Sequence, residues 1–63
     1  MFNITVQSSN LGNLRSAMAK MGVGVAIEST FIDNGVRILD VAIGDCEDKY
    51  SKRVAKAAER YQY

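Results

Sequence analysis

The sequence predicts an α+β fold, a two-layer β-α-β-β-α sandwich in which two helices cover one face of a three-stranded sheet of order 1-3-2. Three observations support this prediction. Period-two alternation marks three strands, three-and-four spacing of apolar residues marks two helices, and an Asp-Asn-Gly turn joins the last two strands. With 63 residues, the chain is expected to form a single domain over residues 1–63.

The first strand and first helix follow directly from the spacing of apolar residues. Phe2, Ile4 and Val6 alternate with polar residues, which predicts a strand with one buried face. The segment 8–10 (Ser-Ser-Asn) then supplies capping side chains. An apolar helical stripe comes next: Leu11, Leu14, Ala17, Met18 and Met21. Gly22 is expected to end this helix in the left-handed conformation.

The second and third strands are expected to form a hairpin, with residues 36–43 as the third strand. A two-residue loop at Asn34-Gly35 would place Phe31 and Ile27 on the face of Asp40. A three-residue loop shifts the pairing by one and moves every side chain of one strand to the other face. That shift gathers the apolar residues on one face: Val25, Ile27, Phe31, Leu39, Val41 and Ile43. We therefore expect the three-residue loop.

In that register two carboxylates, Glu28 and Asp40, lie opposite each other on the sheet face away from the helices. Like charges directly opposite each other destabilise a sheet. Acid–base chemistry would require a cleft and a shifted pKa, which an open sheet face does not offer. Two interpretations stay open: a solvated face with a mild defect, or a face that meets a partner.

The second helix is expected to begin after Gly44, with Asp45 as its N-cap and Asp48 completing a capping box. The single cysteine, Cys46, is then the first member of the buried stripe of this helix. The adjacent carboxylates oppose a thiolate, and the sequence contains no histidine to act as a general base. We therefore expect a structural cysteine, no catalytic residue, no metal site and no cofactor.

The order of the elements sets the sheet topology. A right-handed β-α-β crossover makes the first two strands parallel, and the third strand can then insert between them. The arrangement resembles a ferredoxin-like unit that lacks its last strand. This is a likeness of architecture, and it implies no function.

The composition of the chain argues against several classes of function. The formal net charge of +1 argues against bulk attraction to nucleic acid or to an anionic membrane. No apolar run approaches the roughly 20 residues of a membrane span, and no export signal is expected. A free thiol in a chain without an export signal indicates a reducing compartment, so we expect a cytoplasmic protein.

Basic residues on the second helix form the first candidate surface. The basic stripe consists of Lys49, Lys52, Arg53, Lys56 and Arg60. Its like-charged pairs at a spacing of four residues destabilise an isolated helix. A solvated face accounts for the cations at the negative helix end but poorly for Lys49. The stripe is therefore a candidate contact surface for an acidic protein or for phosphate.

The outer edge of the first strand forms the second candidate surface. Its residues Asn3, Ile4, Thr5, Val6 and Gln7 include no charge, proline or glycine, which are the usual means of blocking an exposed edge. A domain this small is also only marginally stable alone. We expect this edge to pair with a second copy or with a strand of another protein.

Together these features favour a small non-enzymatic interaction protein, a homodimer that binds and modulates or inhibits a larger protein. Short chains of this kind include regulators and inhibitors, among them phage and mobile-element accessory proteins. One alternative is a nucleic-acid-binding protein that uses the basic helix. Another is a small-ligand sensor with its site at a dimer interface.

Overall fold

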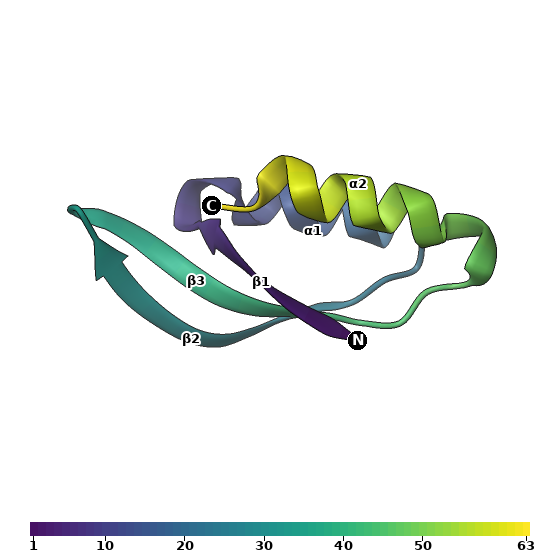
Figure 1. Cartoon of the computed structure of the whole chain (residues 1–63), viewed down its shortest axis with the longest axis horizontal. Helices are drawn as coiled ribbons and strands as arrows, with labels where there is room; N and C mark the ends of the chain where they lie inside the picture. The colour runs from purple at the N-terminus through teal and green to yellow at the C-terminus, as the bar shows by residue number, and fades with distance from the viewer.

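A computed structural model describes all 63 residues and shows the expected α+β fold (Figure 1). The strands are β1 (Phe2–Gln7), β2 (Val25–Asp33) and β3 (Val36–Ile43), and the helices are α1 (Leu11–Ala19) and α2 (Ser51–Tyr61). Short 3₁₀ turns, η1 (Ser8–Asn10) and η2 (Asp48–Tyr50), precede the two helices. The sheet has the order β1-β3-β2, with β3 antiparallel to both neighbours, so β1 and β2 run parallel as expected.

The core lies between the sheet and the two helices, which cover one face of the sheet (Figure 1). Ten buried residues form it: Ile4, Val6, Leu14, Met18, Val23, Leu39, Val41, Ile43, Val54 and Ala58. They come from the apolar faces that the alternation and the helical stripes indicate. No buried residue is polar or charged. Burial of this apolar surface is therefore the main force that holds the two layers together.

The end of α1 confirms the expected role of Gly22. This glycine has φ +70° and closes the helix, as a left-handed C′ residue does. The N–H of Val23 donates to the Met18 carbonyl at 2.9 Å, and the N–H of Gly22 donates to Ala19 at 3.0 Å. These two bonds form a Schellman motif, which satisfies the last carbonyls of α1 and places Val23 in the core.

The expected three-residue hairpin loop is wrong. Asp33 pairs with Val36, so the loop has two residues, Asn34 and Gly35, with φ +51° and +78°. Positive φ at both positions is the type I′ turn, whose twist matches that of the flanking strands. This match explains why the shorter loop forms.

A β-bulge at Glu28 then restores the expected register in the other half of β2. Ile27 pairs with Val41 and Ser29 pairs with Asp40, so Glu28 is the extra residue of β2. In the part of β2 that precedes the bulge, Ile27 shares the face of Val41 as expected. Beyond it, Phe31 pairs with Ile38 and lies on the open face, which corrects its expected place in the core.

The entry to α2 also differs from the expectation. Asp45 does not cap the helix, because residues 44–47 form a connecting segment and α2 begins only at Ser51, after η2. The N–H of Gly44 donates to the Gly24 carbonyl at 2.9 Å, which extends the sheet pairing past the end of β3. The Asp45 carboxylate instead accepts a hydrogen bond from the N-terminal ammonium group of Met1.

Candidate functional site

An open groove between the two helices brings the basic residues of α2 together. It has a volume of about 660 Å³, and α2 supplies most of its walls. Arg53, Lys56 and Arg60 surround it, while Ala17 of α1 and Ala57 of α2 contribute small side chains. Glu59 and Tyr61 complete the lining. The α2 groove thus combines a cationic rim with small apolar residues that leave room for an incoming side chain.

The charge of the α2 groove is largely uncompensated. The molecule contains two ion pairs, Met1 with Asp45 and Lys49 with Glu47, and neither includes a groove residue. The Arg60 guanidinium lies 5.7 Å from the centre of the Tyr61 ring, a cation–π contact that leaves its charge in place. The α2 groove therefore offers three cations to one acid, Glu59.

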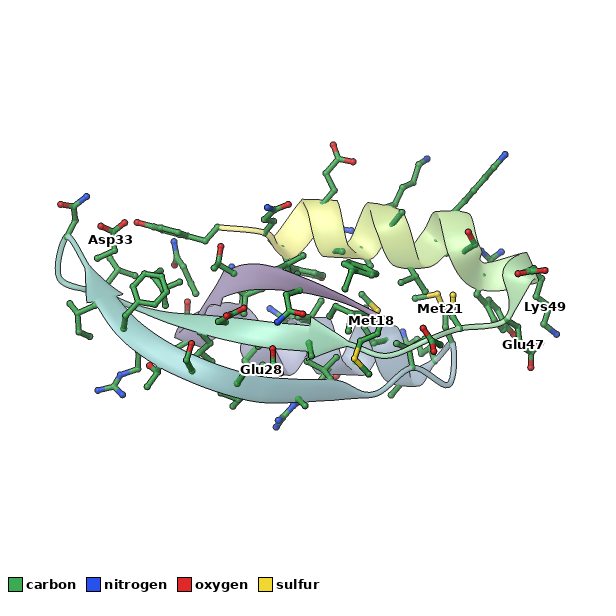
Figure 2. The ribbon with its side chains drawn as sticks, turned by 60° about the horizontal axis from the view of Figure 1, so that its bottom comes forward. Met18, Met21, Glu28, Asp33, Glu47 and Lys49 are labelled. Atoms are coloured by element: carbon green, nitrogen blue, oxygen red, sulfur yellow. The ribbon has the colours of Figure 1, made fainter.

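The structure separates the five residues of the basic stripe into two groups. Lys49 lies in η2, outside α2, and its ammonium is 3.5 Å from the Glu47 carboxylate. Figure 2 shows this pair at the end of the molecule opposite Asp33. Lys52 is exposed on α2 but does not line the groove. Arg53, Lys56 and Arg60 are the residues that the fold gathers.

The edge of β1 is not fully open, which corrects one part of the expectation. Gln62 forms an antiparallel bridge with Val6, and the N–H of Tyr63 donates to the Thr5 carbonyl at 2.7 Å. The chain therefore covers part of this edge with its own last residues, and Figure 1 shows the C-terminus beside the end of β1. The side chains of Ile4 and Val6 point into the core.

The backbone direction of Thr5 follows from the same bond. In an antiparallel strand, the N–H and C=O groups of one residue point to the same side. Because the Thr5 carbonyl faces the tail, its N–H also points away from β3. Association through the β1 edge remains a prediction, and the free part of that edge is the half that begins at Phe2.

The open face of the sheet carries a polar cluster in place of the expected carboxylate pair. Asp40 lies opposite Ser29 and Thr5, not opposite Glu28. The Asn3 amide donates to the Glu28 carboxylate and lies 3.5 Å from an Asp40 oxygen. An amide from β1 thus separates two like charges, which relieves the repulsion that the sequence suggested.

The last residue of the chain links the β1 edge to the β2–β3 hairpin. The Tyr63 hydroxyl donates to the Asp33 carboxylate at 2.7 Å. This hydrogen bond, with a smaller contribution from the negative charge of Asp33, raises the pKa of Tyr63 above its usual value of 10.0. At neutral pH the hydroxyl therefore keeps the proton that it donates to β2.

Cys46 lies half-buried against the core and forms no disulfide. It lines a second hollow beside Phe2 and Val54, near the start of α2. The neighbouring Asp45 is exposed, and its hydrogen bond to the N-terminal ammonium group lowers the pKa of its carboxyl. Contact with the apolar cluster is consistent with the structural role expected for this cysteine.

Spacing on α2 revealed the cations of the groove but not its apolar lining. The apolar spacing of the helices predicts that Ala17 and Tyr61 are core residues. In the folded chain, the packing of α1 against α2 places both at an accessible groove. The tail pairing was also missed, because a bridge of one residue pair has no periodic signal. No helix of the molecule is long and apolar enough to span a membrane.

Comparisons with protein-family models, with curated proteins and with solved structures found no match.

Proposed function

We propose that this protein is a small non-enzymatic interaction module whose α2 groove binds an acidic segment of a larger protein. The observation that carries the proposal is the convergence of Arg53, Lys56 and Arg60 around a groove with small apolar lining residues. Their charges lack an ion-pair partner within the chain, so an external carboxylate would supply one. An apolar side chain beside that carboxylate would fit between Ala17 and Ala57.

The distribution of charge favours a protein over a nucleic acid. Arg53 to Arg60 span about 10 Å of helix, at about 1.5 Å per residue. Contact with three phosphates predicts a salt-dependence slope of only about −2.7, well below that of strong DNA binders.

Site-specific crosslinking tests the proposal. A photoreactive residue in place of Ala57 lies in the groove, whereas one in place of the exposed Ala55 lies on another side of α2. We expect the Ala57 probe, and not the Ala55 probe, to crosslink in host lysate to a protein through an acidic segment. A synthetic peptide of that segment should then bind with modest salt dependence.

Two matched charge reversals provide the control. Arg53→Glu with Lys56→Glu changes the groove, while Arg15→Glu with Lys20→Glu makes the same net change at exposed positions in α1 and directly after it. The first pair should abolish peptide binding and the second should preserve it. Equal binding by both variants would contradict the proposal. Competition by a DNA duplex with a steep salt dependence would favour the nucleic-acid alternative instead.

A further inference from the structure

The outer edge of β2 is the most exposed apolar part of the molecule. All of its residues from Ala26 to Ile32 are exposed, although β2 is a strand of nine residues. Ile27, Phe31 and Ile32 have exposed fractions of 47%, 46% and 60%. Figure 1 shows that the β2–β3 hairpin projects beyond the ends of both helices, so neither helix covers its tip.

The backbone of β2 beyond the bulge is ready to pair with another strand. In a two-residue hairpin the flanking pair, here Asp33 and Val36, is hydrogen-bonded across the two strands. Alternation then directs the N–H and C=O groups of Phe31 to β3 and those of Thr30 and Ile32 outward. No strand lies on that side, because β2 ends the sheet.

We infer that two copies of this chain associate by antiparallel pairing of this part of β2, around a two-fold axis at Phe31. Thr30 of each copy would then pair with Ile32 of the other, each pair exchanging both N–H···O bonds. Phe31 would lie opposite Phe31 of the second copy, at a position where side chains approach closely. Ser29 would face Asp33, so this register places no like charges opposite each other.

The area involved fits a second copy of the chain. Phe31 and Ile32, the large apolar residues of the paired segment, leave roughly 200 Å² of side chain exposed in one copy, at 150–250 Å² for a large side chain. Two such surfaces with their strand backbones would bury roughly 800 Å² in total, the size of a weak and transient interface. Self-association through such an interface should therefore depend on protein concentration.

The proposed dimer would not interfere with binding through the α2 groove. A two-fold axis perpendicular to the sheet places both helical layers on the same side. Both α2 grooves would therefore stay accessible, since no groove residue lies on β2. Charge reversal of Arg53 and Lys56 should leave the dimer intact, so failure of one proposal is distinguishable from failure of the other.

Two proline substitutions test the inference. Thr30→Pro removes an outward N–H on β2, and Thr5→Pro removes an outward N–H on β1. Neither N–H bonds β3, so both variants should fold. Analytical ultracentrifugation from low to high micromolar concentration should show a dimer for the wild type and for Thr5→Pro, and a monomer for Thr30→Pro.

Several results would overturn the proposed β2 dimer. A monomeric wild type at all concentrations would overturn the inference, and so would loss of the dimer in Thr5→Pro but not in Thr30→Pro. If Thr30→Pro fails to fold, Ile32→Glu replaces it, because Ile32 is largely exposed and its cross-strand partner Arg37 accommodates a carboxylate. A folded Ile32→Glu monomer would support the inference, and an undiminished Ile32→Glu dimer would overturn it.

Discussion

Replacing glycine by alanine at the two ends of α1 should change stability in opposite directions. Gly12 lies in the first turn of α1, and Gly22 follows its C-terminal end. An added Cβ meets no atom within 4 Å at either position, so steric clash is excluded as a cause. The two substitutions therefore isolate the effect of the backbone conformation.

The magnitudes follow from the dihedral angles. At Gly22, with φ +70°, alanine adopts the left-handed region at a cost of about 1–2 kcal/mol. At Gly12, in the first turn of the helix, alanine gains at most about 0.5–1 kcal/mol over glycine, the value for a helix interior. The two variants should therefore differ by about 2 kcal/mol in the free energy of unfolding. For a domain of this length that corresponds to roughly 8–16 °C in Tm.

Circular dichroism at 222 nm during urea and thermal unfolding measures both variants against the wild type. The urea midpoint should rise for Gly12→Ala and fall for Gly22→Ala, with an unchanged m value. A Gly22→Ala variant as stable as Gly12→Ala would refute the reasoning. It would show that α1 does not end in the Schellman motif in solution.

Two further predictions concern the cysteine and the tail. Cys46→Ala should cost about 1 kcal/mol or less and preserve binding through the α2 groove, because the thiol only packs beside the core; rapid alkylation of the native protein with loss of that binding would contradict this. Tyr63 should titrate above pH 10.0 in a tyrosinate absorbance titration, and Tyr63→Phe should remove this component. Because the folded-state pKa is raised, the tail contact should stabilise the fold below pH 10.0 and be lost as the pH rises through that pKa.

The sequence was sufficient for the architecture because the buried faces are periodic. Alternation in β1 and the stripe through Leu14 and Met18 each specify one apolar face, and only the two-layer sandwich buries them all. The ends of elements were less predictable. Residues 48–50 form a 3₁₀ turn, so Lys49 leaves the basic stripe although its sequence spacing fits the helix.

The hairpin shows why register is difficult to derive from pattern alone. The apolar pattern near Ile27 requires one pairing, and the Asn34-Gly35 turn requires another that differs by one residue. If the two strands are assumed to pair in one register throughout, either the apolar pattern or the turn type must be ignored. The chain satisfies both by inserting Glu28 as a bulge, and the turn-side half of β2 then presents Phe31 on the open face.

The short C-terminal tail also limits how far the sheet can grow. Any sheet that joins monomers at β2 still has β1 at its two outer ends, and a bare strand there would let further molecules add without limit. Gln62 and Tyr63 occupy part of that position, and the Tyr63–Asp33 hydrogen bond holds them in place. Addition of a strand along the whole length of β1 must first displace the tail, which disfavours unlimited edge-to-edge growth of the sheet.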